Sequence, residues 1–549
     1  MMTSDPTFTR RDFLKITSAG LFGAMLAGCQ TLEPNVVSIP NRPNVLFVIV
    51  DDLRPELGCY GNHEIITPHV DAFARDGMLF SQAYCQAAAC APSRASVMTG
   101  LRPDSNLVWS LGEKFRETVP NVVTLPQHFH KFGYYTVSLG KIFHNHMPDR
   151  VSFDEPDLRP EAYNTPELID RDPESFYYDE GLKKELAEVR AERIKKNPKA
   201  YAGGWAYGRS YECSDAPDDA FYDGAQTSLA LKILKRIKLK KQPFFLALGY
   251  YRPHLPFVAP KKYWDLYDRN ALSPASNPYL PQNSPVMAMN SMYELGGCYD
   301  LEYVKHPATF QLPQETARVL KHGYYASVSY VDACLGKLLN GLDDLGLTED
   351  TIVVVWGDHG WKLGEHGSWC KQTNYNIDTR VPLIIRAAGI KSKFHDCSKL
   401  IELVDLYPTL CDLAGIETPG YLEGVSIEPL LKRPERKWKS AVFSQYVRTP
   451  RVTPDKKYYM GYSMVTEKYH YVEWRYWDNK KKVAGELAAL ELYDMESDPE
   501  ENVNISDLPT SKKIINQLAQ QLQAGWRKAL PRTRRQVSKK IPSHKHSQV

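Results

Sequence analysis

The sequence lacks the features that mark several common classes of protein. Its 549 residues include ten cysteines, but these are scattered singly without a Cys-x-x-Cys pair, so neither a zinc ribbon nor a dense disulfide scaffold is indicated. The net charge is only +3, which gives no overall field suited to nucleic acid, and we expect no nucleic-acid partner. The sequence contains no internal repeat. No segment after the N-terminus is long and apolar enough to cross a bilayer.

The N-terminus carries two short motifs of bacterial export. The pair Arg10-Arg11 resembles a twin-arginine signal, and the apolar run that follows it is too short for a stable membrane anchor. The tetrapeptide that ends in Cys29 resembles a lipobox, with Cys29 as the lipidated first residue of the mature protein. We therefore predict a periplasmic or cell-surface protein that touches the membrane only through a lipid on Cys29. The alternative is an N-terminal helix of the fold.

Four apolar runs predict strands that are buried on both faces, as in a parallel sheet. These runs are Asn44–Val50, Tyr134–Leu139, Pro243–Tyr250 and Thr351–Trp356. Each run is followed by polar or charged residues. Because ligands of open α/β sheets bind beyond the carboxyl ends of the strands, we expect one common site at this edge.

Two of these runs end in groups that suit a metal ion. Asp51 and Asp52 follow the first run, and Asp358 and His359 follow the last. Mostly oxygen ligands favour calcium or magnesium over zinc, and adjacent carboxylates are costly to hold together without a cation. A turn or helix cap is the alternative for Asp51 and Asp52 taken alone. The matching position of Asp358 and His359 favours the metal site.

The stretch from Cys90 to Arg94, Cys-Ala-Pro-Ser-Arg, is the most informative motif. Pro92 is a favoured first-turn residue, so we predict a helix over residues 93–98 with Cys90 at its N-terminus, where free N–H groups favour an anion. Arg94 lies one turn in, where it can hold the groups around Cys90 in place. A buried structural cysteine is the alternative, because free cysteine is among the most buried residue types.

This motif, continued by Thr99-Gly100, resembles the signature of type I sulfatases in the alkaline phosphatase superfamily. Two segments, residues 443–446 and 460–463, are similar to the iduronate-2-sulfatase group in particular. The similarity runs from about Arg42 to Asn504. It implies an α/β fold with a large mixed, mostly parallel sheet sandwiched by helices and a smaller C-terminal α+β subdomain.

The resemblance also implies a chemistry. A formylglycine-generating maturase would convert Cys90 to an aldehyde, whose hydrate offers one hydroxyl to attack sulfur and a second to release sulfate. Arg94 would support this nucleophile. One Ca²⁺ per chain would be bound by the modified Cys90 together with Asp51, Asp52, Asp358 and His359. The sulfate and its leaving oxygen would be held by cationic donors, which lower the barrier, and by histidines able to act as general acids: Lys141, His144, His254 and Lys371.

These features predict a sulfuric ester hydrolase that acts on sulfated oligo- or polysaccharides. One alternative is a phosphodiesterase or phosphatase of the same superfamily, but such enzymes use Ser or Thr with two zinc ions. The other is a lipoprotein that only binds sulfated glycans. In such a protein we would expect loss of Cys90 or of a metal ligand, and neither has occurred.

The predicted organisation has five parts: a signal over residues 1–29, a tether over 30–42, a catalytic domain over 43–440, the C-terminal subdomain over 441–530 and a basic disordered tail over 531–549. Further elements are predicted as a charged helix over Leu182–Lys196, a pocket-shaping loop over Ser273–Tyr303, strands over Tyr458–Ser463 and Tyr469–Trp477, and a final helix over Ser511–Lys528.

Overall fold

The computed structural model of the chain describes residues 42–144, 147–165, 176–198, 207–390, 395–453 and 455–531. The predicted export signal, Cys29, the tether up to residue 41 and the tail from residue 532 lie outside these ranges. Within them, no helix combines the length and apolarity needed to span a bilayer. The nine cysteines of this part of the chain are all free thiols.

A mixed eight-stranded sheet forms the centre of the fold. Its order is β14 (Asp396–Cys397), β2 (Met78–Phe80), β13 (Leu383–Arg386), β9 (Thr351–Gly357), β1 (Asn44–Val50), β7 (Phe244–Tyr250), β4 (Tyr135–Gly140) and β5 (Glu155–Leu158). The five strands from β9 to β5 run parallel, whereas β13 is antiparallel to both of its neighbours. The predicted mostly parallel sheet, including all four predicted strands, is confirmed.

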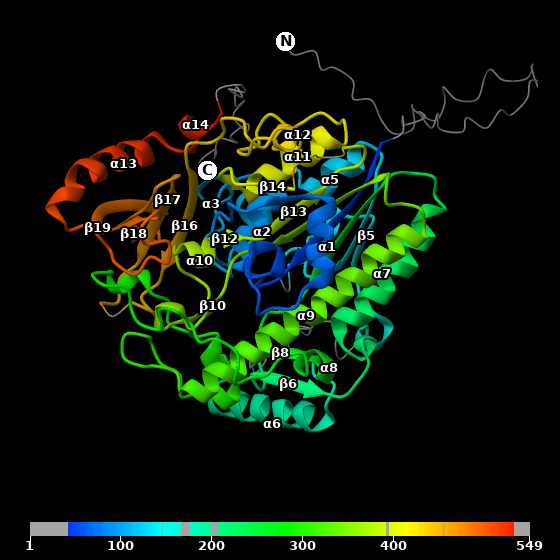
Figure 1. Ribbon diagram of the computed structural model, residues 1–549, viewed down its shortest axis with the longest axis horizontal. Helices are drawn as coiled ribbons and strands as arrows, with labels where there is room; N and C mark the ends of the chain where they lie inside the picture. The colour runs from blue at the N-terminus through cyan, green and yellow to red at the C-terminus, as the bar shows by residue number, and fades with distance from the viewer. Residues whose placement is uncertain are drawn as a thin grey trace, which may run out of the picture. The chain divides into compact units, whose positions relative to one another are not determined.

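Helices cover both faces of this sheet (Figure 1). One face packs against α1 (Pro68–Asp76), α7 (Tyr222–Lys238) and α9 (Gln314–Asp344), and the other against α2 (Cys90–Thr99), α5 (Leu125–Lys131) and α11 (Leu406–Leu413). Alternate residues of β1 enter the two cores: Leu46, Val48 and Val50 join the first, and Val45, Phe47 and Ile49 join the second. Burial on both faces is why the strand is apolar throughout.

The carboxyl ends of the central strands lie level with one another. Val50 pairs with both Tyr250 and Gly357, and Gly140 pairs with Gly249. The residues that follow these strands are therefore delivered to one edge of the sheet.

A separate antiparallel sheet forms the C-terminal region, in the order β16 (Val442–Arg448), β17 (Tyr459–Val465), β18 (Tyr469–Asp478) and β19 (Val483–Asp494). The helix predicted over residues 511–528 is present as two pieces, α13 (Lys512–Ala524) and α14 (Trp526–Ala529). Gly525 separates them with a φ of 74°, a conformation that ends a helix and that glycine adopts without strain.

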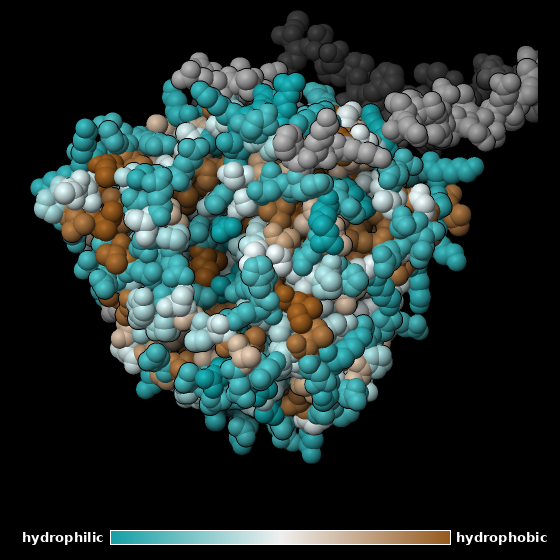
Figure 2. Space-filling view, in the orientation of Figure 1, coloured by the Kyte–Doolittle hydropathy of each residue, from teal (hydrophilic) through white to brown (hydrophobic). Residues whose placement is uncertain are grey.

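Smaller elements complete the described chain. Three small sheets are present among the described residues. One contains β12 (Arg380–Val381), β3 (Ala83–Tyr84) and β15 (Ile401–Glu402) in that order. The other two pair β6 (Tyr211–Ser214) with β8 (Phe257–Pro260), and β10 (Lys362–Leu363) with β11 (Trp369–Cys370). The predicted charged helix is α6 (Glu180–Lys196), whose N-terminus is capped by Asp179. The predicted loop over 273–303 contains short 3₁₀ turns and two isolated β-bridge residues, Gln282 and Cys298. On the face shown in Figure 2, hydrophilic residues predominate and apolar ones form separate small patches.

Candidate functional site

Four buried side chains form a cluster at the carboxyl edge of the central sheet. Asp51 and Asp52 follow β1, His359 follows β9, and Cys90 is the first residue of α2. One ligand atom from each of the four lies within 4.8 Å of the others. We call this set the cation cluster, because carboxylate oxygens with an imidazole form a donor set suited to a hard divalent cation.

The orientation of His359 suits a ligand role. Its Nδ1 lies 3.0 Å from the carbonyl oxygen of Gly360, so a proton on Nδ1 is held there and the lone pair of Nε2 faces the cluster. Nε2 lies 3.2 Å from Cys90 Sγ and 3.4 Å from Asp52 Oδ1. Burial lowers the pKa of His359, which favours the neutral imidazole that a metal requires.

Asp358, also a predicted ligand, lies beside the cation cluster. Its Oδ1 accepts the backbone N–H groups of Asp52 and His359, each at 3.1 Å, and lies 3.6 Å from His359 Nε2. Its Oδ2 accepts Arg94 Nε at 2.8 Å. One oxygen of Asp358 therefore faces the cluster, while the other is engaged by Arg94.

Arg94 ties three strand ends together from within α2. Besides its bond to Asp358, it donates Nη2 to Asp51 Oδ1 at 3.1 Å and Nη1 to the carbonyl oxygen of Lys141. Its side chain has no exposed surface. Because a buried guanidinium requires anionic or carbonyl partners on all sides, Arg94 fixes the positions of Asp51 and Asp358 relative to Cys90.

The helix that carries Cys90 is buried along its whole length. The serine and threonine side chains of α2 bond to backbone carbonyls; Ser93 Oγ, for example, donates to the carbonyl oxygen of Asp358 at 2.5 Å. Burial, with a smaller effect from Asp51, raises the pKa of the Cys90 thiol well above its ordinary value. Burial thus disfavours the thiolate of an unmodified Cys90, which is the form that acts as a nucleophile.

Three of the four predicted sulfate-binding residues converge on the cation cluster. Lys141 Nζ lies 2.6 Å from Asp51 Oδ2, Lys371 Nζ lies 2.7 Å and 2.9 Å from the two oxygens of Asp52, and His254 Nε2 lies 3.7 Å from Asp52 Oδ2. All three side chains are buried. His144 follows on the segment of Lys141 and is half-buried.

Lys141 and Lys371 form ion pairs with the carboxylates of the cation cluster, but burial, the largest effect, keeps the pKa of Asp52 raised above its usual value despite Lys371. Burial alone would raise the pKa of Asp51, but Lys141 and then Arg94 outweigh it and hold that pKa well below its usual value. Burial also opposes protonation of Lys371, yet Asp52 raises the pKa of this lysine well above normal. The site therefore holds two ammonium groups directly beside the candidate metal ligands.

Three residues that the sequence did not single out complete this side of the site. Glu294 Oε2 lies 3.2 Å from Lys371 Nζ, and Gln372 Nε2 donates to the hydroxyl of Tyr293 at 2.6 Å. Glu294 and Tyr293 lie in the loop over residues 273–303, which was predicted to shape a pocket. Nothing in the local sequence distinguishes this glutamate from a surface residue.

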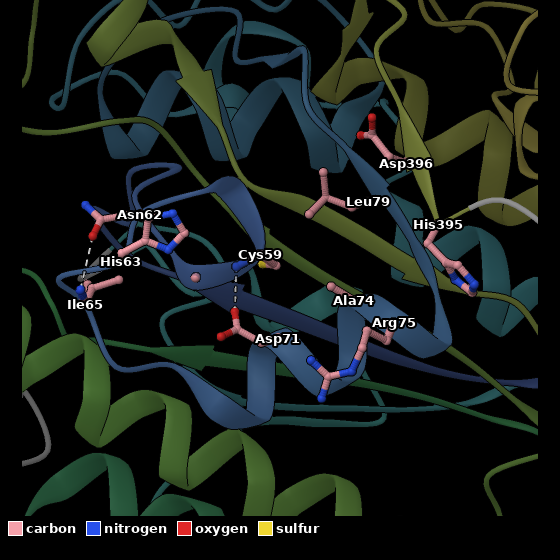
Figure 3. Close-up of a pocket in the computed structure, with 11 residues that line it drawn as sticks. Cys59, Asn62, His63, Ile65, Asp71, Ala74, Arg75, Leu79, His395 and Asp396 are labelled. Carbon is pink, nitrogen blue, oxygen red and sulfur yellow. Dashed lines mark hydrogen bonds between the residues drawn. The ribbon is translucent and has the colours of Figure 1, made fainter.

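A separate cavity of about 550 Å³ lies away from these residues, between α1 and the start of β14 (Figure 3). Its lining includes Cys59, His63, Asp71 and Asp396. The close-up shows Asp71 accepting the backbone N–H of Cys59, a bond of 2.7 Å. None of the predicted site residues lines this cavity.

Comparison with known proteins identifies what the chain is similar to. The model of the family "Sulfatase" matches residues 43–416, and that of "N-sulphoglucosamine sulphohydrolase, C-terminal" matches residues 364–528. Iduronate 2-sulfatase of Mus musculus is 32% identical over 519 residues, which cover 84% of this chain and 90% of the mouse protein.

Two solved structures share the fold. BT4656 in complex with its substrate D-glucosamine-2-N,6-O-disulfate has a TM-score of 0.64 at 21% identity, over 88% of this chain and 97% of the other. The phosphonate monoester hydrolase of Agrobacterium radiobacter has a TM-score of 0.63 at 22% identity, over 88% and 95% of the two chains. At these identities the likeness concerns the fold alone.

Proposed function

The chain belongs to the sulfatase family and is a sulfuric ester hydrolase, and we propose that its substrates are sulfated oligo- or polysaccharides of the iduronate 2-sulfate type. Similarity to iduronate 2-sulfatase over 84% of the chain supports the sugar class. Residues 443–446 and 460–463, which resemble that group in particular, lie on β16 and β17.

The observation that carries this proposal is the meeting of Cys90, two carboxylates and His359 within 4.8 Å, with Lys141, Lys371 and His254 directly against them. A sulfate ester is anionic, and its hydrolysis builds charge on the oxygens around sulfur. Preorganised cations in a site without water stabilise that charge in the transition state.

We propose that Ca²⁺ is held by Asp51, Asp52, Asp358 and His359, with the group derived from Cys90 completing the set. The fit rests on the donor set, in which carboxylate oxygens of Asp51 and Asp52 and an imidazole nitrogen of His359 lie within 4.8 Å of one another. When bound, the ion would supply Lewis-acid stabilisation of the sulfate oxygens.

Cys90 is proposed to act as formylglycine, whose hydrate provides the attacking hydroxyl and the hydroxyl that expels sulfate. The position of Cys90 Sγ among the candidate metal ligands, with Lys141 and Lys371 beside them, supports this role. Arg94 keeps Asp51 and Asp358 in register, and Lys141 and Lys371 orient the sulfate group.

His254 is suited to protonate the leaving alkoxide. Its Nδ1 lies 2.6 Å from the carbonyl oxygen of Leu255, so a proton on Nδ1 is held there, and Nε2 points toward Asp52 and the site. A proton on Nε2 can pass to the departing sugar oxygen, so the products are the alcohol and inorganic sulfate.

Mass spectrometry of the tryptic peptide spanning Asp76 to Arg94 tests the modification, beside a sulfate-release screen over defined sulfated oligosaccharides. We expect the mass of an aldehyde at residue 90 and release of sulfate from a sulfated uronic acid. An intact thiol in fully active enzyme would contradict the proposed nucleophile.

The alternative function is hydrolysis of phosphorus esters, because a phosphonate monoester hydrolase has the same fold. Comparing hydrolysis of an aryl sulfate with that of the matching aryl phosphate separates the two activities. We expect the sulfate ester to be the better substrate. Metal analysis together with the sulfate-release assay separates an active enzyme from a lipoprotein that only binds glycans.

For location, we propose export by the twin-arginine route and anchoring through a lipid on Cys29. The support is the order and spacing of the two N-terminal motifs. Cell fractionation of the wild-type chain and of Cys29→Ala tests it. Membrane retention of Cys29→Ala would contradict the lipid anchor.

A further inference from the structure

The strand β16 of the C-terminal sheet lies directly against the segment that leads into Cys90. Ser444 Oγ donates to the carbonyl oxygen of Cys85 at 2.6 Å, and the backbone N–H of Gln445 donates to that of Gln86 at 2.8 Å. Gln86 is only four residues before Cys90. The C-terminal sheet therefore forms part of the frame of the site.

The last residue of β16, Arg448, joins this frame to two loops. Its Nε donates to the carbonyl oxygen of Met287 at 2.7 Å, Nη2 donates to that of Ala288 at 2.8 Å, and Nη1 donates to that of Gln372. The guanidinium carbon lies 4.8 Å from the ring centre of Tyr446 and 5.6 Å from that of Trp474. Arg448 is 2% exposed, so these contacts fix its position.

Both loops held by Arg448 carry residues of the site. Gln372 is adjacent to Lys371, and the turn at Met287 and Ala288 leads to Glu294. The two loops meet where Lys371 Nζ lies 3.2 Å from Glu294 Oε2 and where Gln372 bonds Tyr293. Arg448 thus bonds both loops, which are also joined by Asn290, whose Nδ2 donates to the carbonyl oxygen of Lys371 at 2.6 Å.

The backbone at Lys371 needs such support. Cys370 and Gln372, on either side of it, have φ values of 69° and 79°, a left-handed conformation that residues other than glycine rarely adopt. Met292 on the facing loop has a φ of 52°. Strained residues of this kind persist only where surrounding contacts hold them, and they concentrate at functional sites.

We propose that Arg448 is a positioning residue for Lys371: by bonding the Gln372 carbonyl and the Met287–Ala288 turn together, it holds Lys371 in the strained turn that aims its ammonium group at the sulfate. This inference rests on the proposed function, in which Lys371 contacts the sulfate group. Arg448 itself acts through the two loops.

A double-mutant cycle tests this inference, with Arg448→Lys and Lys371→Gln made singly and together. Lysine keeps the charge of Arg448 but cannot reach three carbonyls in a planar fork. We expect Arg448→Lys to lower kcat/KM for an aryl sulfate by about 10- to 100-fold, as for a displaced catalytic group, and to raise the inhibition constant of inorganic sulfate. In the Lys371→Gln background, followed at high enzyme concentration, the same change should cost less than about twofold.

Arg102→Lys serves as the matched control. Arg102 is a buried arginine whose guanidinium bonds Glu402 at 2.7 Å and 2.6 Å, so its replacement also removes a forked contact. We expect it to lower the thermal midpoint at least as much as Arg448→Lys while leaving kcat/KM per folded molecule within about threefold of wild type, because Arg102 bonds neither of the two loops that carry Lys371 and Glu294.

Three results would overturn the inference: an unchanged kcat/KM in Arg448→Lys, a loss explained by a smaller folded fraction, or the same loss with and without Lys371. If Lys371→Gln alone retains full activity, the sulfate-binding role of Lys371 fails, and the inference fails with it. Full activity of Arg448→Lys beside an inactive Lys371→Gln would overturn only the inference.

Discussion

At the scale of single residues, we expect replacement of Cys90 to abolish turnover without abolishing calcium binding. Its Sγ is one of four clustered ligand atoms, so Cys90→Ala leaves both carboxylates and His359 in place. We expect this variant to bind calcium, measured by titration calorimetry, while sulfate release falls by at least about 10³-fold, as for loss of a nucleophile. Cys90→Ser is the matched control, because its hydroxyl can attack but lacks the second hydroxyl that expels sulfate, so we expect at most one turnover per chain. Appreciable steady-state activity in either variant would refute the assignment of Cys90.

Individual site residues were predictable where a strand carried them to the edge of the sheet. Asp51, Asp52 and His359 each come immediately after a buried apolar strand, and the topology brings them together. Glu294 was not predictable, because its place beside Lys371 depends on how a loop without regular structure folds back. The detailed geometry of Asp358, one oxygen on Arg94 and one toward the cluster, also follows only from packing.

At the scale of elements, a buried ionic network connects the catalytic region to β16. Glu402, at the end of β15, accepts hydrogen bonds from both terminal nitrogens of Arg102. It also accepts one from Lys439 Nζ at 2.7 Å and one from the backbone N–H of Phe443 at 2.9 Å. Burial alone would raise the pKa of Glu402, but Arg102 and Lys439 outweigh it and lower the pKa to about 2. Arg102 follows α2 in the chain, and Lys439 precedes β16. The Glu402 carboxylate therefore connects the region after α2 with the start of the C-terminal sheet.

This network predicts a pH dependence of stability. Because the folded pKa lies below the ordinary value, the stabilisation is present above about pH 4.5 and is lost as the pH falls towards 2, with a size of about 3 kcal/mol. We expect Glu402→Gln to lower the free energy of unfolding in urea at pH 7, with the difference from wild type shrinking by pH 3. Glu428→Gln removes only the surface pair with Lys432, so we expect a change of less than about 1 kcal/mol. A deficit in Glu402→Gln that is constant across this pH range would contradict the pKa argument.

Elements differed in how well the sequence predicted them, and burial explains the difference. The central strands are apolar throughout because both faces are covered, so a continuous run identifies them. Strand β19 was missed because its first half is exposed and rich in alanine, leucine and glutamate, residues that favour helices. Its pairing with β18 overrides that local preference.

At the scale of the whole molecule, the cation cluster links metal binding to folding. Residues that are far apart in sequence, from Asp51 to His359, meet only in the folded chain. Any cation bound there therefore stabilises the folded state, by about 2.7 kcal/mol at a hundredfold excess over the dissociation constant.

We expect calcium to raise the thermal midpoint of the metal-free protein and EDTA to reverse the rise, as followed by calorimetry. Asp52→Asn is the control, because it removes one ligand charge and should remove most of the calcium-dependent shift. A wild-type midpoint that is identical in calcium and in EDTA would argue against a metal at this cluster.

The burial of Cys90 sets an order of events in the life of the chain. Its side chain is only 2% exposed at the start of a helix that is buried on all sides, so another enzyme cannot take this thiol into its own active site once α2 has packed. The proposed oxidation to formylglycine would then precede folding, and a chain that folded first would be trapped as a thiol form without the proposed nucleophile. We expect a maturase to convert the unfolded chain or a peptide spanning residues 76–94, but to leave the refolded unmodified protein unchanged. Efficient conversion of the refolded protein would show that the helix opens on the timescale of maturation.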